Sequence, residues 1–296
     1  MAHQTDYVFW VKLASRASVL VAITLIVAKL FAWLYSGSAS MLASLADSTS
    51  DLAASLVNFF ALRIAITPAD DDHRFGHGKA ESLAALAQSA FITGTALVLI
   101  FYGGERLLEQ APVERTNLGI GVSAFAIVLT FGLVLLQRIA HAKTQSRVIA
   151  ADALHYKSDL LLNLSVLIAL VLSQYGWWWS DGLFAILIAL YLGWQSLQLG
   201  KEAINELMDK ELSPEVQQQI YDITMAHPQT QGAHDIRTRQ SGRMVFVQLH
   251  LDLDADLSLY QAHDIADTIE HKIEQLFDHA EVIIHQDPVN TDGSHR

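Results

Sequence analysis

The chain has 296 residues, of which 52% are hydrophobic and only 17% are charged, whereas a soluble domain usually carries about 25% charged residues. Its net charge of −12 makes nucleic acid an unsuitable partner. Because it contains no cysteine, it can form no disulfide and no thiolate metal site, and its metal ligands must be His, Asp and Glu.

Long apolar segments follow one another through the first two thirds of the chain. Each approaches the ~20 residues that a membrane-spanning helix needs. Polar and ionisable residues interrupt the second and fifth segments, so a hydropathy window scores both as weak. The continuous apolar run at 125–136 is atypical of the amphipathic helices in a soluble bundle. We therefore expect six transmembrane helices, near 9–34, 40–65, 80–105, 117–140, 147–172 and 178–200.

The distribution of Lys and Arg near the helix ends predicts the orientation in the membrane. Basic residues concentrate on one side, which the positive-inside rule makes the cytoplasmic side. Both chain termini should then be cytoplasmic, as an even number of spans requires. Trp177, Trp178 and Trp179 fall in a short outer loop, where interfacial aromatic residues are common. The ten cytoplasmic basic residues are Lys12, Arg16, Arg63, Arg74, Lys79, Arg138, Lys143, Arg147, Lys201 and Lys210, against Arg106 and Arg115 outside.

The composition changes after Lys201. Residues 201–296 carry 7 Lys and Arg against 18 Asp and Glu, a net charge of −11. The pattern predicts a helix over 213–226, strands over 233–240 and 244–252, a helix over 258–277 and a strand over 281–286. This α-β-β-α-β order resembles a small ferredoxin-like α+β domain. We expect a transmembrane domain at 1–208 and a cytoplasmic metal-binding domain at 209–296.

Two pairs of ionisable residues lie in the polar membrane segments. Asp47 and Asp51 are four residues apart, as are His155 and Asp159, so each pair shares one face of its helix. Ionisable groups at membrane depth are costly and mark a transport path or pair with one another. One imidazole nitrogen and three carboxylate oxygens form a tetrahedral shell that Zn²⁺ accepts. The alternative is a polar contact between helices.

Two further regions are rich in histidine. The loop between the second and third segments brings Asp70, His73 and His77 within reach of one metal ion, although a solvated acidic loop is the alternative. The abundance of His in the acidic tail favours at least one metal site, and the sequence does not choose among the candidates. These are His227, His234, His250, His263, His271, His279, His285 and His295.

Taken together, these motifs resemble the cation diffusion facilitator family over nearly the whole chain. The resemblance rests on six membrane segments, the paired Asp of the second, the His and Asp of the fifth, the Asp-His-Arg-Phe-Gly-His-Gly-Lys loop at 72–79 and the small cytoplasmic domain. It implies a homodimeric Zn²⁺/H⁺ antiporter of a bacterial inner membrane, with a metallochaperone-like tail that joins the protomers and senses metal.

The resemblance also implies roles for individual residues. Asp47, Asp51, His155 and Asp159 match the family's transport site, and Asp70, His73 and His77 match its loop site. His234, His250 and Asp287 match one tail zinc position, while His263 and His285 match a second that Asp287 bridges. Lys79 and Asp209 match an ion pair between the membrane and cytoplasmic parts.

The expected activity is proton-coupled efflux of Zn²⁺, or of Cd²⁺ or Fe²⁺, from the cytoplasm. Zn²⁺ requires a neutral His155 and ionised carboxylates, so protons compete with the metal. Two other functions are weighed: a membrane zinc hydrolase and a metal-sensing membrane receptor. The hydrolase lacks a His-Glu-x-x-His helix or a serine motif, and a receptor needs no buried quartet. We therefore expect a transporter, not an enzyme, while the sequence leaves the metal open among Zn²⁺, Cd²⁺, Fe²⁺ and Mn²⁺.

Overall fold

The computed structural model describes residues 2–36, 39–108, 117–173, 177 and 179–289. Arg115, Trp178 and His295 lie outside the described residues. Asp47 and Arg106 lie in described helices, but their side chains are outside the description. The chain divides into two compact units, Met1–Ile204 and Asn205–Arg296, and each is described by itself.

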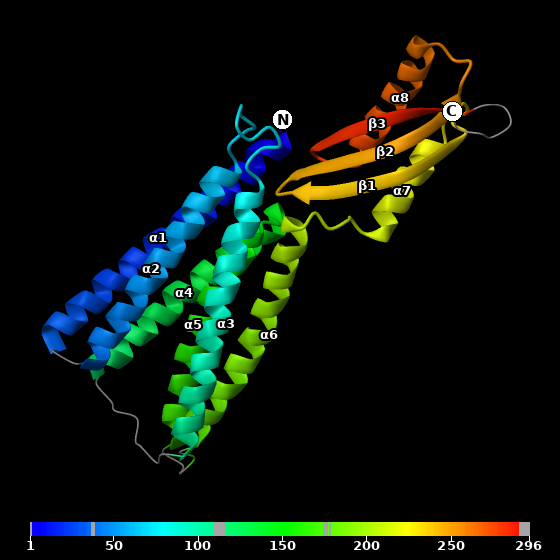
Figure 1. Ribbon diagram of the computed structural model, residues 1–296. Helices are drawn as coiled ribbons and strands as arrows, with labels where there is room; N and C mark the ends of the chain where they lie inside the picture. The colour runs from blue at the N-terminus through cyan, green and yellow to red at the C-terminus, as the bar shows by residue number, and fades with distance from the viewer. Residues whose placement is uncertain (1, 37–38, 109–116, 174–176, 178, 290–296) are drawn as a thin grey trace. The chain divides into compact units, whose positions relative to one another are not determined.

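The first unit is helical (Figure 1). Helices α1, α2, α4 and α5 pack together, with contacts between α1 and α2, α1 and α4, α4 and α5, and α2 and α5, while α3 packs on α2 and α5. Helix α6 joins α3 through Ser196, whose hydroxyl donates to the Ser89 carbonyl oxygen at 3.0 Å. The helices are α1 (Ala2–Ser36), α2 (Ala39–Ala65), α3 (Lys79–Leu108), α4 (Asn117–Thr144), α5 (Arg147–Ser173) and α6 (Ser180–Leu207).

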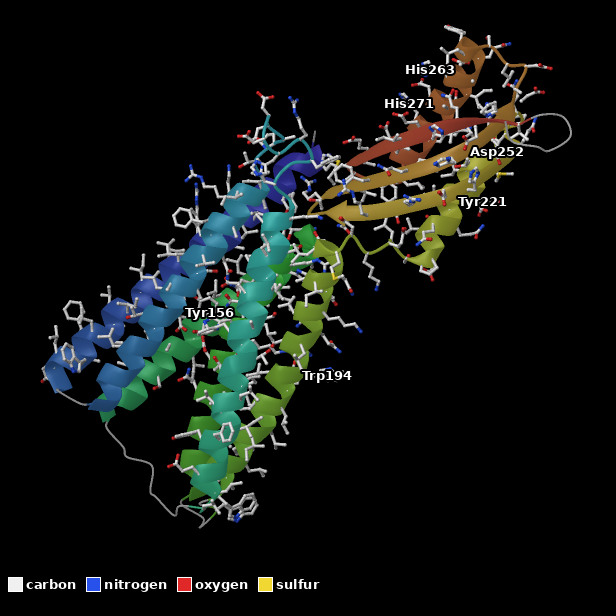
Figure 2. All side chains as sticks on the ribbon, viewed as in Figure 1. Tyr156, Trp194, Tyr221, Asp252, His263 and His271 are labelled. Atoms are coloured by element: carbon white, nitrogen blue, oxygen red, sulfur yellow. The ribbon has the colours of Figure 1, made fainter. Side chains whose placement is uncertain are left out.

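Four of these helices are long and apolar enough to cross a membrane. The spans are Tyr7–Tyr35, Lys79–Glu105, Gly121–Thr144 and Gly182–Leu207, in α1, α3, α4 and α6. Large apolar side chains such as Phe101 lie exposed on these helices, as contact with lipid requires. Trp194 of α6 is another, and it is labelled in Figure 2. These four spans are the ones found in the described part of the chain, while α2 and α5 carry polar and ionisable residues along their length.

The second unit is an α+β domain with the predicted order α-β-β-α-β. Strands β1 and β2 are antiparallel, and β2 and β3 are parallel, which gives the sheet order β1-β2-β3. Gly242 has a positive φ of 58° in the turn between β1 and β2, as a tight hairpin requires. The elements are α7 (Pro214–Met225), β1 (Gly232–Ser241), β2 (Met244–Asp254), α8 (Leu259–Glu274) and β3 (Ala280–Val289).

The two helices and one face of the sheet enclose the core of this domain. Val247, Leu249 and Leu251 alternate along β2 and are almost fully buried, together with Ile220 of α7 and Ile269 of α8. Since successive strand residues point to opposite faces, His250 and Asp252 belong to the face that the helices leave open. The fold thereby places tail histidines on a surface rather than in the core.

Candidate metal-binding sites

Three clusters of His and carboxylate side chains that could hold a metal ion lie among the described residues. The first lies between α2 and α5. His155 Nε2 is 3.1 Å from Asp51 Oδ1 and 3.9 Å from Asp159 Oδ2. One ligand atom from each residue lies within 4.8 Å of the other two. Asp51 and His155 are only 8% and 6% exposed, so the cluster is a buried set of N and O donors of the kind that divalent transition metals bind.

A second buried carboxylate lies one turn before His155 on α5. Asp152 accepts hydrogen bonds from Ser18 of α1 at 2.5 Å, Asn58 of α2 at 3.0 Å and Gln137 of α4 at 2.6 Å. All four side chains are buried. Asp152 therefore links the four helices that pack together in this unit. The network is not evident from the sequence, because its members come from four separate helices and share no local spacing.

A lysine on α1 also contacts the helix that carries Asp51. Lys29 Nζ donates to Ser48 Oγ at 2.6 Å, and Lys29 lies inside the apolar span of α1. A basic residue at this depth is costly and usually functional. The signal that could have identified it is the single charge in the apolar run 17–35.

The second cluster is the loop between α2 and α3. Asp70 Oδ1 accepts from the backbone N–H groups of Asp72 and His73, at 3.1 and 2.7 Å. His73 Nδ1 lies 3.4 Å from Asp70 Oδ1, and His77 Nε2 lies 3.5 Å from Asp70 Oδ2. The hydrogen bond from the His73 backbone holds the pKa of Asp70 below its usual value. Asp70 and His73 are exposed, whereas the side chain of His77 is only 15% exposed, so the three residues form a surface cluster.

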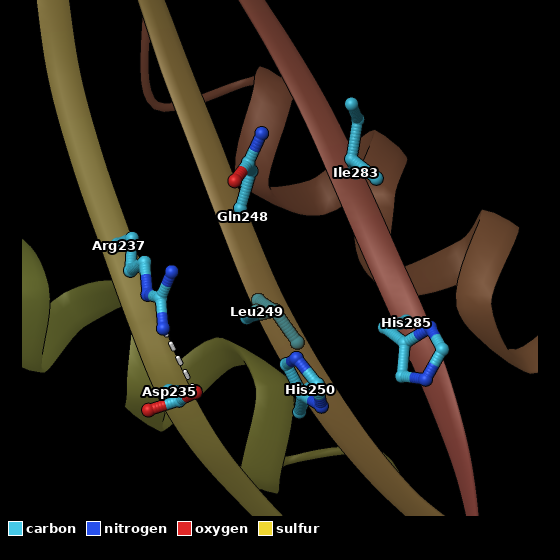
Figure 3. A pocket seen from close by; sticks show the side chains of 7 residues that line it. All are labelled: Asp235, Arg237, Gln248, Leu249, His250, Ile283 and His285. Carbon is cyan, nitrogen blue, oxygen red and sulfur yellow. Dashed lines mark hydrogen bonds and ion pairs between the residues drawn. The ribbon is translucent and has the colours of Figure 1, made fainter.

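The third cluster lies on the open face of the sheet. Strand register places His234 opposite His250 and His250 opposite His285, so three histidines form a row across the strands. Figure 3 shows His250 and His285 on neighbouring strands at the wall of a cavity of about 370 Å³. Asp287, two residues after His285, lies on the same face. Register thus selects, among the tail histidines, those that can share a metal ion.

Asp287 is the centre of this cluster. Its Oδ2 lies 2.7 Å from His250 Nδ1 and 3.6 Å from His234 Nε2, while its Oδ1 lies 3.3 Å from His285 Nε2. Burial raises the pKa of Asp287, but the hydrogen bond with His250 and the three neighbouring histidines outweigh it, and the pKa is lowered. His234, His250 and Asp287 bring their ligand atoms within 4.8 Å, and the second Asp287 oxygen points to another histidine.

Asp252 lies behind His234, on the side of Nδ1. Its Oδ1 lies 3.5 Å from His234 Nδ1, which leaves Nε2 for a metal ion. Such carboxylate–histidine pairs fix the tautomer and raise ligand basicity. Gly232 makes room for this carboxylate, because a Cβ at that position would overlap Oδ2 of Asp252. Neither residue was identified from the sequence, since their role depends on the pairing of β1 with β2.

The remaining candidates are not brought together in the described part of one chain. His263 lies exposed on α8 (Figure 2), the helix that covers the opposite face of the sheet, so its pairing with His285 stays a prediction. His271 contacts Asp267 on its own helix. Lys79 begins α3 in the first unit, and Asp209 belongs to the second, where Arg239 Nη1 lies 3.5 Å from Asp209 Oδ1. The ion pair between Lys79 and Asp209 stays a prediction.

Comparison with known families identifies the class of protein. Residues 15–208 match the cation efflux transmembrane domain, and residues 212–289 match the cytoplasmic domain of cation efflux proteins. The chain therefore belongs to the cation efflux family, also called the cation diffusion facilitators, and is a multi-pass membrane transporter that moves divalent metal cations out of the cytoplasm. The members of this family are transporters and not enzymes, so this chain is not a zinc hydrolase. The same assignment replaces the alternative of a metal-sensing receptor.

Similar individual proteins cover both units. The cation-efflux pump FieF of Shewanella oneidensis is 61% identical over 99% of this chain and 99% of its own length. FieF of Salmonella choleraesuis is 49% identical over 94% of this chain and 93% of its own length. A solved zinc form of CzrB is 26% identical, covers 30% of this chain and 99% of its own, and has a TM-score of 0.26, a value too low to support any inference.

Proposed function

We propose that this chain exports Zn²⁺, and related ions such as Cd²⁺ and Fe²⁺, from the cytoplasm in exchange for protons. The observation that carries the proposal is the short approach between His155 Nε2 and Asp51 Oδ1, at 3.1 Å, inside the membrane domain of a cation efflux protein. A buried imidazole between carboxylates favours Zn²⁺ and its neighbours over Mg²⁺ or Ca²⁺.

The proposed transport site consists of Asp47, Asp51, His155 and Asp159. Three of these form the buried cluster. Asp47 lies one turn before Asp51 on α2, and residues four apart share a helix face. Three carboxylates and one imidazole then supply four donors, which satisfies the tetrahedral preference of Zn²⁺.

Proton coupling follows from the charges of these ligands. The metal needs an unprotonated imidazole and ionised carboxylates, so protons and metal compete for the same atoms. With the site open to the cytoplasm, Zn²⁺ displaces protons. With the site open to a more acidic exterior, protons displace Zn²⁺. Alternate exposure couples outward metal movement to inward proton movement.

The proposed topology has six transmembrane helices, α1 to α6, in a domain at 1–208, with both termini in the cytoplasm and the domain in a bacterial inner membrane. Helices α2 and α5 are long enough, at 27 residues each, to cross ~30 Å of hydrocarbon. Their polar faces meet one another at Asp51 and His155, where both side chains are buried.

The proposed role of the cytoplasmic domain, at 209–296, is to join two protomers and to sense metal. His234, His250 and Asp287 would hold one Zn²⁺, and His263 and His285 a second, with Asp287 as the bridge. The donors fit Zn²⁺, because the cluster offers imidazole nitrogens and a carboxylate within 4.8 Å. The net charge of −11 over residues 201–296 should make two such domains repel until metal is bound. The ion pair between Lys79 and Asp209 is proposed to link the two units.

A vesicle experiment tests this function. The purified protein is reconstituted with a metal-sensitive dye and a pH-sensitive dye inside, and Zn²⁺, Cd²⁺, Fe²⁺, Mn²⁺ or Mg²⁺ is added outside. The expected result is uptake of Zn²⁺ together with alkalinisation of the vesicle lumen, because the lumen loses protons in exchange. Metal uptake without a change in luminal pH would contradict proton exchange, and Mg²⁺ transport at the Zn²⁺ rate would contradict the ligand assignment.

A further inference from the structure

A cavity of about 720 Å³ lies between α4, α5 and α6, apart from the metal clusters. One end is apolar and is lined by Phe131 and Leu135 of α4 and by Leu161 of α5. The other end carries the basic side chains of Arg138 and Lys157. Phe131 and Leu135 are half exposed or more, so this end opens to the membrane.

Both cations lack an anionic partner within the described residues. Arg138 is exposed and has no hydrogen-bond or ion-pair partner there. Lys157 Nζ donates to the Tyr191 hydroxyl at 2.5 Å and lies 4.8 Å from the centroid of the same ring. Tyr191, which makes both contacts, is a neutral partner. A charged side chain inside a membrane is expected to have a partner.

The single carboxylate of the cavity does not supply that partner. Glu202 of α6 lies 3.3 Å from Arg147 Nη1 at the start of α5, and this ion pair neutralises it. The cavity therefore presents two uncompensated positive charges beside an apolar groove. A divalent metal ion would be repelled by this pair of charges, which excludes the cavity as a metal path.

Arg138 lies nearer the cytoplasmic ends of these helices than Lys157 does. At 1.5 Å per residue, Arg138 lies ~9 Å from the end of α4 and Lys157 ~15 Å from the start of α5. These helix ends are adjacent in the chain and are cytoplasmic in the topology proposed above. Basic pockets between helices on the cytoplasmic side bind anionic lipid headgroups.

We infer that the cavity between α4, α5 and α6 binds an anionic phospholipid of the cytoplasmic leaflet, with its phosphate between Arg138 and Lys157 and its acyl chains along Phe131, Leu135 and Leu161. The bound lipid would connect α4 with α6 across α5, the helix that carries His155 and Asp159. The site depends on the proposed orientation but not on the identity of the transported metal.

Native mass spectrometry of the purified full-length protein tests this inference. Phosphatidylglycerol, which is anionic, and phosphatidylcholine, which is zwitterionic, are titrated separately, and bound lipid is counted. The double variant Arg138→Gln/Lys157→Gln should bind phosphatidylglycerol ~30-fold more weakly, since each basic residue contributes about a factor of five. The matched double variant Lys12→Gln/Arg63→Gln removes the same charge at the same side of the membrane and should bind like the wild type.

Three results would overturn the inference. They are wild-type phosphatidylglycerol binding by the Arg138→Gln/Lys157→Gln variant, an equal loss in the Lys12→Gln/Arg63→Gln control, and full displacement of the lipid by millimolar inorganic phosphate, which would make the site one for free phosphate. Thermal unfolding of each variant in detergent checks that the membrane domain is folded. Should the double variant fail that check, the single variant Arg138→Gln carries the test, because Arg138 is exposed and its removal leaves the helix packing intact.

Discussion

His155 of α5 and Asp51 of α2 lie 3.1 Å apart, measured from Nε2 to Oδ1, and both are buried. The contact joins two helices that each carry a pair of ionisable residues four positions apart. Helical spacing alone brings the members of one pair together. The contact between His155 and Asp51 brings the pair on α5 next to the pair on α2. The two pairs together can then supply four donors to one metal ion.

Replacing the imidazole should change which metal is transported. In His155→Asp, an oxygen ligand replaces the one nitrogen donor, so we expect the preference to move from Zn²⁺ towards harder ions such as Mn²⁺. The pH profile of metal release should also change, because a carboxylate and an imidazole differ in how they bind protons. Transport of each metal by the reconstituted variant measures both effects. An unchanged order of metals and an unchanged pH profile would show that His155 is not a ligand.

The carboxylate of Asp152 should matter for stability more than for metal choice. In Asp152→Ala, Ser18 keeps the Ala14 carbonyl oxygen and Gln137 keeps Ser18 Oγ as acceptors. The Asn58 amide loses Asp152 as its acceptor, and an unpaired buried group costs about 1–3 kcal/mol. Thermal unfolding in detergent should show a marked decrease in melting temperature. Asp152→Asn keeps one acceptor oxygen and should lose less. Equal melting temperatures for wild type and both variants would mean that the network does not hold the four helices together.

Gly232 offers a test of the tail site that removes no ligand. In Gly232→Ala, the new Cβ overlaps Asp252 Oδ2, so Asp252 must move away from His234. Loss of such an orienting carboxylate typically weakens metal binding by about 10–100-fold. Calorimetric titration of the tail site with Zn²⁺ measures this, and Gln231→Ala, at the exposed neighbouring position, is the control. Wild-type affinity in Gly232→Ala would contradict the role of Asp252.

Asp287→Ala should be the most damaging single change in the tail. Its two oxygens contact three histidines, so one substitution affects both proposed zinc positions. We expect fewer zinc ions per protomer and a dimer that dissociates at higher protein concentration, while the membrane site still binds Zn²⁺. Zinc stoichiometry and analytical ultracentrifugation measure the two effects. Wild-type values for both would show that the tail site is misassigned, and an empty membrane site would show that the two sites are coupled.

Acid should empty the tail site through its histidines rather than through Asp287. The pKa of Asp287 is lowered from 3.8 by its histidine neighbours, so its interactions are present above the unfolded pKa and are lost only as the pH falls through the lower, folded pKa. Histidines ordinarily protonate near pH 6.5, and protonated imidazole cannot bind metal. Zinc release followed by a dye should therefore occur well above pH 3.8. Release only below that value would contradict this order.

Much of the cytoplasmic domain is readable from local sequence signals. Ser258 and Gln261 form the reciprocal hydrogen bonds of a capping box at the start of α8, and Gly242 takes the positive φ expected of the hairpin turn. Alternation in β2 predicts its buried and open faces. The pairs Asp47 and Asp51, and His155 and Asp159, are likewise visible because their spacing matches the helical period.

Other parts depend on contacts between distant segments and carry no local pattern. The polar groups around Asp152 come from four helices. The choice of His234, His250 and His285 from the tail histidines depends on strand register, which includes an irregularity between His234 and Arg237. In α2 and α5 the sequence signal runs the other way, because polar residues that interrupt the apolar pattern, such as Asp51 and His155, contact the neighbouring helix.

The central claim is that a buried quartet exchanges Zn²⁺ for protons, and Asp51→Ala tests it most directly. The variant removes the carboxylate that approaches His155 most closely and should still fold and dimerise. Zn²⁺ flux driven by a pH step is measured in proteoliposomes that contain equal amounts of wild-type or variant protein. The account predicts that the step drives Zn²⁺ flux in the wild type and none above the protein-free background in the variant; pH-driven flux of wild-type magnitude in Asp51→Ala would contradict it.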